Sequence, residues 1–305
     1  YRYWKKNLKG KKHTDFVVLK GIEYDTRDAG HILVIMPEGV KMRLLEMRGM
    51  PLALLIDLVH RNGGVLGPAH PCGEKYMSFT HARRYYLSPE IVKRFDFIET
   101  FNCCEPKDSN AGALKLAEKY GKVMTGGSDS HKLESERYEG ATEPSIPGDP
   151  ATLVYMNGLS PDHLMQGVAA GHVIVCRYIR AEVSFYYHGR QYLPGDRIET
   201  GNAAGDLLYC KGSVTGLPEE AELFLVNDSG KKKISWSKRG SQLGEIDLEI
   251  PWGQGDWQWT RLEIRDPVGK FLAYLNPVYR GEHHSGCKTF GEAVKGWQKH
   301  REKNV

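Results

Sequence analysis

The sequence is poor in the features that mark secreted proteins. It has only six cysteines among 305 residues, no two of them form a C-x-x-C pair, and Cys103 and Cys104 are adjacent. Such cysteines suit reduced thiols better than a disulfide framework. The first residues contain no apolar segment followed by a small-residue cleavage site, so no signal peptide is visible. We therefore expect a cytoplasmic protein.

Long hydrophobic runs and a strong excess of one charge are also lacking. The richest apolar run, Met50 to Val59, is interrupted by Asp57 and is too short to span a bilayer. Lys and Arg number 42 against 38 Asp and Glu, and the segment from Lys288 to Val305 holds most of the excess. A nucleic-acid-binding surface needs clustered positive charge on the folded body. We expect neither a membrane span nor a nucleic-acid partner.

What the chain does contain is enough apolar sequence for a core. Hydrophobic residues make up 40% and charged residues 26%, which excludes a disordered chain, and the length fits about two domains. Up to about residue 175, short apolar segments alternate with amphipathic ones, which predicts an α/β domain with a largely parallel sheet over residues 1–175. The expected strands are 16–23, 31–36, 65–70, 95–99 and 123–125, and the expected helices are 51–61, 88–94 and 110–120.

From about Arg180 onward, the helical period disappears. Alternating runs such as 181–187, 221–226 and 261–265 are separated by glycine- and asparagine-rich turns, which predicts a small antiparallel β-sandwich at residues 176–285. The aromatic-rich stretch from Trp252 to Trp259 is typical of the core of such a domain. A last amphipathic segment predicts a C-terminal helical tail at 286–305.

Polar residues capable of binding metal stand at the ends of the predicted strands of the first half. Because α/β folds place their sites at strand ends, these side chains are expected to converge. Imidazole and carboxylate groups together form a mixed nitrogen and oxygen shell suited to Zn, Mn or Fe. Glycines before the last pair permit a close approach of the backbone to a metal. The residues are Glu23, His31, His70, Glu99, Asp129 and His131.

Each of these residues alone has a simpler explanation. A lone histidine is more often a core or surface residue than a ligand, by roughly four to one. A single glutamate such as Glu23 would be a surface charge at a strand end. The repeated occurrence of such residues at successive strand ends favours a metal site.

The segments that carry these residues resemble the successive motifs of the PHP (polymerase and histidinol phosphatase) superfamily. They are Gly21-Ile-Glu-Tyr-Asp-Thr, Gly30-His-Ile-Leu-Val, Gly67-Pro-Ala-His-Pro71, Phe97-Ile-Glu-Thr-Phe-Asn102 and Gly127-Ser-Asp-Ser-His131. The second half, with Leu193-Pro-Gly-Asp196, resembles the CehA/McbA-type branch of metal-dependent hydrolases. The resemblance implies a distorted seven-stranded β/α barrel holding two or three divalent metal ions.

The resemblance also implies roles for single residues. It makes Glu23, Asp129 and His131 catalytic, and Glu99 and Asn102 would support the ligands or shape the substrate site. The implied metal ligands are Glu23, His31, His70, Asp129 and His131.

Two motifs of the family are not found in this chain, namely the His-x-His and Asp-His pairs of the first strands. Either the sequence is an incomplete record or the protein has lost part of the site. We favour the first alternative, because a barrel without two strands would expose sheet edges.

We expect a metal-dependent hydrolase that acts on a small molecule. Phosphoesters are the default substrates, and esters, amides or carbamates come second. The remaining alternative is a degenerate, non-catalytic scaffold whose β-sandwich binds a partner or polysaccharide. The oligomeric state stays open.

Three cysteines follow the site motifs directly. Cys72 comes after His70-Pro71, and Cys103 and Cys104 come after Asn102. A catalytic thiol would need a base beside it, and no Cys-His signature supports that. We expect small buried residues beside the site.

Overall fold

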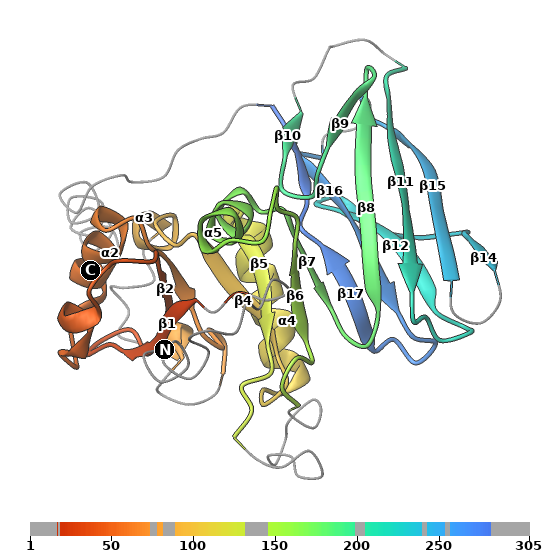
Figure 1. Cartoon of the computed structure of the whole chain (residues 1–305). Coiled ribbons are helices and arrows are strands. Elements are labelled where there is room, and N and C mark those ends of the chain that lie inside the picture. Colours follow the sequence, from red (N-terminus) through yellow and green to blue (C-terminus); the bar gives the residue numbers. More distant parts are fainter. Residues whose placement is uncertain are drawn as a thin grey trace, which may run out of the picture.

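The computed structural model describes residues 17, 19–73, 78–81, 89–131, 146–198, 205–239, 243–253 and 257–281. Figure 1 shows the first half of the chain on one side and two large β-sheets on the other. The elements of the first half are β1 (Lys20–Asp25), β2 (His31–Met36), η1 (Met42–Glu46), α2 (Leu52–Arg61), β3 (Val65–Pro68), η2 (Phe79–His81), α3 (Pro89–Val92), β4 (Phe97–Asn102), α4 (Lys107–Tyr120) and β5 (Val123–Gly127).

The first three strands form an antiparallel sheet in the order β1–β2–β3. A five-residue turn joins β1 to β2, and Asp25 pairs with His31 across it. The buried side of α2, represented by Leu55 and Val59, shares one core cluster with Ile32 and Val34 of β2. The α2 helix therefore fixes which face of this sheet is covered.

The next two strands, β4 and β5, are parallel and are connected by α4. Every residue of β4 is buried. The helix ends at Gly121, which adopts the left-handed conformation with φ 58° that glycine tolerates best. Parallel pairing brings the carboxyl ends of β4 and β5 to the same edge, where the candidate site lies.

The remaining elements are mostly strands. They are β6 (Ala151–Val154), α5 (Pro161–Ala170), β7 (Val173–Cys176), β8 (Arg180–Tyr187), β9 (Arg190–Tyr192), β10 (Arg197–Ile198), β11 (Leu207–Thr215), β12 (Glu222–Asn227), β13 (Gly230–Ile234), β14 (Ser237–Arg239), β15 (Leu243–Pro251), β16 (Trp259–Arg265), β17 (Phe271–Leu275) and β18 (Val278–Arg280).

These strands form two sheets. One runs β10–β18–β16–β17–β7–β6, with β12 paired to β16 and β13 paired to β12, and the other runs β14–β15–β11–β8–β9. A single hydrophobic cluster contains Phe185 and Cys210 of one sheet together with Leu262 and Ile264 of the other. The two sheets therefore share a core.

The three tryptophans of the aromatic-rich stretch lie in the core, as predicted. Trp252 is fully buried, and Trp257 and Trp259 are at most 9% exposed. Trp252 and Trp257 also pack edge to face, with ring centroids 5.1 Å apart.

The predicted seven-stranded β/α barrel is wrong. Within the described residues there is no closed barrel, and β1, β2 and β3 are antiparallel rather than parallel. The connection between β1 and β2 has only five residues, which is too short for the crossover that parallel strands require. These two strands can therefore pair only in the antiparallel direction. The predicted tail helix at 286–305 lies outside the described residues.

The proposed domain boundary near residue 175 stays a prediction. The sheet order adds one fact about it, because β6 precedes that boundary and β7 spans it, and yet both strands belong to the same sheet as β16 and β17. No helix in the described part of the chain is long and apolar enough to cross a membrane.

Candidate metal centre

The side chains of Glu23, His31 and His70 meet at one point on the antiparallel sheet. His31 Nδ1 lies 2.8 Å from Glu23 Oε1, and His70 Nε2 lies 3.1 Å from the same oxygen. The two imidazole rings stand edge to face with centroids 5.3 Å apart. The possible ligand atoms of the three residues all lie within 4.8 Å of one another.

The strand register explains this meeting. Glu23 pairs with Leu33, so His31, two residues before Leu33, lies diagonally opposite Glu23 on the same face. His70 follows β3, whose Pro68 pairs with Ile32 beside His31. An antiparallel sheet therefore places the three side chains together without any barrel.

The electrostatics of this group favour a charged carboxylate. Hydrogen bonds from His31 and His70 hold the pKa of Glu23 well below its usual range. For His70, burial opposes the charged form, but the hydrogen bond to Glu23 and the negative charges of Glu99, Glu23 and Asp129 raise its pKa overall. The influence of Asp129 on His70 indicates that the second group of candidate ligands is close by.

That second group consists of Cys104, Asp129 and His131, whose possible ligand atoms also lie within 4.8 Å of one another. Cys104 follows β4 and the other two follow β5, and the parallel pairing of these strands brings them together. His131 Nδ1 lies 3.3 Å from Asp129 Oδ1 and 2.8 Å from the Asp129 carbonyl oxygen.

Asn102 connects the two groups through Glu99. Its side-chain Nδ2 lies 3.1 Å from Glu99 Oε2 and 3.1 Å from Asp129 Oδ2, and its Oδ1 accepts from the Cys104 backbone at 2.8 Å. The backbone N–H of His70 donates to the same Glu99 oxygen at 2.7 Å. Burial raises the pKa of Glu99 to about 7. A continuous polar network therefore runs from His70 to Asp129.

Strained backbone marks two residues of the site. Of the described residues other than glycine, only four have positive φ, and two of these are His70 at 28° and Asp129 at 48°. Such conformations persist where the surroundings fix them, and they concentrate at functional sites. Gly127, the glycine before Ser128, leaves room for a neighbouring side chain, since a Cβ there would lie 2.4 Å from Glu99 Oε1. The space is occupied by the Glu99 carboxylate.

A cavity of about 500 Å³ adjoins this network. Glu23 and Glu99 line it together with apolar side chains of β1, β2, β4 and α5, and none of the described residues that line it is Lys or Arg. The apolar lining includes Ile22, Leu33, Ile35, Phe97, Leu164 and Val168.

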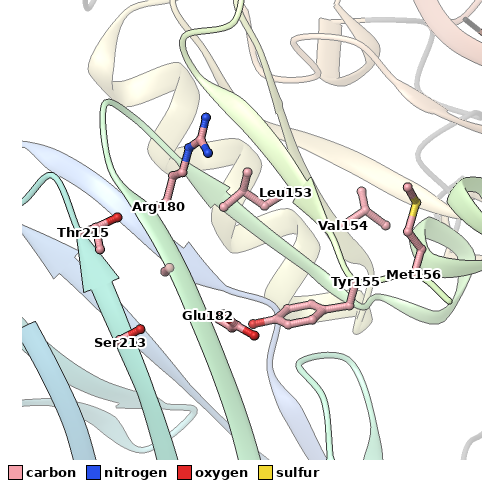
Figure 2. A pocket seen from close by; sticks show the side chains of 9 residues that line it. Leu153, Val154, Tyr155, Met156, Arg180, Glu182, Ser213 and Thr215 are labelled. Carbon is pink, nitrogen blue, oxygen red and sulfur yellow. The ribbon is translucent and has the colours of Figure 1, made fainter. Parts of the chain in front are cut away.

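A second cavity, of about 530 Å³, lies between β6 and the strands β8 and β11 (Figure 2). Arg180, Glu182 and Tyr155 border it, and the part of its lining that the structure describes includes no histidine or cysteine. The described lining of this second cavity therefore offers no mixed set of metal ligands, whereas Glu23 of the first group lines the first cavity.

The predicted site residues thus fall into two neighbouring groups. Glu23, His31 and His70 form one, Asp129 and His131 belong to the other, and Glu99 and Asn102 lie between them. Sequence reasoning placed Cys104 near the site but did not include its thiol among the ligands. It also missed Asn110, whose side chain bonds the backbone N–H and carbonyl of Asn102 at 2.8 and 2.9 Å.

Comparison with known families gives one match. Residues 107–135 match the family model described as PHP-associated (PHP_C). This stretch contains α4, β5, Asp129 and His131, and the match supports membership of the PHP superfamily. No curated protein matches the chain. The CehA/McbA branch stays a prediction.

Proposed function

We propose that this protein is a metal-dependent hydrolase that acts on phosphoesters. The observation that carries the proposal is the polar network itself, in which one carboxylate between two imidazoles is joined through Glu99 and Asn102 to a second group of possible ligands. The PHP-associated match over Asp129 and His131 supports the same conclusion. Many members of that superfamily are metal-dependent phosphoesterases.

The donor atoms of this network fit divalent metal ions. Carboxylate and imidazole donors suit Zn, Mn and Fe. A bound ion would supply a water molecule of lowered pKa and an electrostatic partner for charge that develops on oxygen. Glu23 and Asp129 would offset the positive charge of the ions, and His31, His70 and His131 would add nitrogen ligands.

The surrounding residues would fix the orientation of these ligands. Glu99 is 5% exposed and accepts from the backbone of His70, while Asn102 is 1% exposed and donates to Asp129. Such outer partners hold a ligand in one rotamer and contribute tenfold to a hundredfold in metal affinity. The apolar cavity beside Glu23 would receive the part of the substrate that does not react.

One observation favours a second candidate function, the hydrolysis of esters, amides or carbamates. Among the described residues that line the cavity of Glu23 and Glu99 there is no Lys or Arg, and apolar side chains predominate. The negative charge of a phosphoester is usually bound by cationic side chains or metal ions, whereas a neutral acyl group needs neither for binding. Bound metal ions would neutralise part of the negative charge of a phosphate. The extent of this neutralisation decides whether phosphoesters or neutral acyl substrates are hydrolysed.

The test is hydrolysis by the purified chain loaded with Mn, Zn or Fe(II). The substrates are p-nitrophenyl phosphate, bis(p-nitrophenyl) phosphate and p-nitrophenyl butyrate. We expect hydrolysis of a phosphate substrate, with about a hundredfold loss in both His70→Ala and Asp129→Ala. The control is His172→Gln, because His172 also pairs with a carboxylate, Asp196 Oδ1 at 2.9 Å, but belongs to neither group of ligands.

Three results would decide the matter. Hydrolysis of the butyrate ester alone would replace the phosphoesterase by the second candidate. Hydrolysis that survives in both site variants, or no hydrolysis with any metal, would overturn the proposal.

A further inference from the structure

The thiol of Cys104 lies beside the second group of candidate ligands, although the predicted metal ligands include no cysteine. Its possible ligand atom lies within 4.8 Å of those of Asp129 and His131. The side chain is half-buried rather than packed away from solvent. Sulfur, carboxylate oxygen and imidazole nitrogen therefore converge at the carboxyl ends of β4 and β5.

Hydrogen bonds hold the partners of this thiol in place. Cys104 Sγ lies 2.9 Å from the carbonyl oxygen of Asp129. Asn102 Nδ2 holds Asp129 Oδ2 at 3.1 Å, while Asp129 Oδ1 faces the His131 ring. The backbone N–H of Cys104 is fixed on Asn102 Oδ1 at 2.8 Å. The same amide thus orients both the cysteine and the aspartate.

The neighbouring cysteine shows that this arrangement is specific. Cys103 is fully buried, and its Sγ lies 3.2 Å from the carbonyl oxygen of Asp149, away from both groups of ligands. Both cysteines stand in the turn that follows β4, and their side chains take different directions there. Only one thiol of the Cys103–Cys104 pair therefore faces the site.

We propose that Cys104 is a metal ligand, so that the second group is a sulfur-containing site selective for zinc. This inference rests on the proposed metal centre and deepens it. On binding, the S–H bond of Cys104 breaks, a sulfur–metal bond forms, and the proton passes to solvent. The group of Glu23, His31 and His70 offers only oxygen and nitrogen and suits a wider range of metals. The two groups then differ in metal preference.

The selectivity follows from the softness of the donors. Thiolate ligands favour Zn and related soft ions, whereas carboxylates and water suit Mn and Mg. Replacing the thiol by a carboxylate should therefore keep a ligand in place and weaken the preference for Zn over Mn. Cys104→Asp is the variant that separates loss of the ligand from a change in its chemistry.

The experiment is titration of the metal-free full chain with Co²⁺, followed by absorption spectroscopy. Cobalt bound to thiolate gives an intense near-ultraviolet charge-transfer band, while its visible bands report cobalt with any ligands. We expect the near-ultraviolet band in the wild-type chain and in Cys103→Ala, and its complete loss in Cys104→Ser and Cys104→Asp. Competition of Zn with Mn should show at least a tenfold weaker preference for Zn in Cys104→Asp than in the wild type.

The outcomes separate this inference from the proposed function. Cobalt binding with visible bands but no thiolate band in the wild type would overturn the role of Cys104 and leave the metal centre intact. A band that persists in Cys104→Ser would also overturn it. No cobalt binding at all would overturn both proposals. Circular dichroism of each variant establishes that the fold is retained.

Discussion

The backbone N–H of His70 donates to Glu99 Oε2 at 2.7 Å, so a residue that follows β3 is tied to the middle of β4. The bond crosses between two sheets that share no ladder. Because Glu99 also accepts from Asn102, a displacement of its carboxylate would disturb both groups of candidate ligands. The position of this one side chain is therefore central to the site.

Gly127→Ala should displace that carboxylate. An added Cβ would lie 2.4 Å from Glu99 Oε1, and Glu99 is too buried and too well bonded to move aside freely. We expect metal affinity to fall by about tenfold to a hundredfold. Isothermal titration with Zn or Mn measures the change. Gly112→Ala, whose added Cβ would lie 3.2 Å from Cys72 Cβ, should leave affinity unchanged. Equal affinities in the two variants would contradict the role assigned to Glu99.

Asn102→Leu should weaken both groups at once. The substitution keeps the approximate volume but removes the amide that donates to Glu99 and Asp129 and accepts from Cys104. We expect a loss of about 1–3 kcal/mol in the free energy of unfolding, since buried polar groups lose their partners. Metal content, measured by elemental analysis after dialysis, should fall as well. Asn62→Leu, at an exposed helix end, is the control and should retain its metal. A variant with full metal content would show that the amide is dispensable.

Glu263 should control stability in acid. Burial opposes its charge, but Arg261 and Arg265 outweigh burial and lower the pKa to about 2 from 4.5. Because the folded pKa is depressed, its contribution is present above pH 4.5 and is lost as the pH falls toward 2. The shift corresponds to about 3 kcal/mol at neutral pH. Glu263→Gln should therefore lower the free energy of unfolding at pH 7 by roughly that amount.

Urea denaturation at several pH values tests this expectation. The stability of the wild type should decline between pH 4.5 and 2 more steeply than that of Glu263→Gln. Glu222→Gln is the matched control, because Glu222 also pairs with a cation, Lys233, but in an exposed position. Such surface pairs contribute about 0–1 kcal/mol. Parallel pH profiles for the wild type and Glu263→Gln would exclude the proposed effect.

The ion pair between Arg177 and Asp149 should be costly to break from one side. Arg177 Nη2 lies 2.5 Å from Asp149 Oδ2, and the two side chains are 0% and 9% exposed. Arg177→Met leaves a buried carboxylate without its partner, which typically costs about 3–5 kcal/mol. The double variant with Asp149→Leu should recover much of that loss, because it removes both charges. Thermal and urea unfolding measure the difference, and a double variant less stable than Arg177→Met would refute this explanation.

Local structure could largely be predicted from the sequence. The strand at 31–36 agrees with β2, and the helix expected at 110–120 corresponds to α4 at Lys107–Tyr120. The fold class could not be predicted in this way. Apolar periodicity specifies which face of a strand is buried, but it carries no information on the direction of the neighbouring strand. The antiparallel β1–β2–β3 sheet was therefore missed.

The candidate site could likewise be predicted from the sequence only in part. Glu23, His31 and His70 were noticed because metal-ligating residue types stand at strand ends, and the structure brings them together. The approach of Cys104 to Asp129 depends on the register of β4 against β5, which shifts between Glu99 and Phe101. No sequence pattern reports such a shift. Residue type alone therefore led to a reading of Cys104 as a small residue beside the site.

Asn276, next to the end of β17, closes the outer edge of a strand that belongs to the candidate site. Its Oδ1 accepts from the N–H of Met124 in β5 at 2.7 Å, and its Nδ2 donates to the Met124 carbonyl at 3.0 Å. Hydrogen exchange at Met124 should consequently report openings of the large sheet more than 140 residues further along the chain. If the last strands detached, we expect the first effect to be fraying of β5, the strand that Asp129 and His131 follow. We therefore expect the candidate metal-binding edge and the distant sheet to unfold together as one cooperative unit.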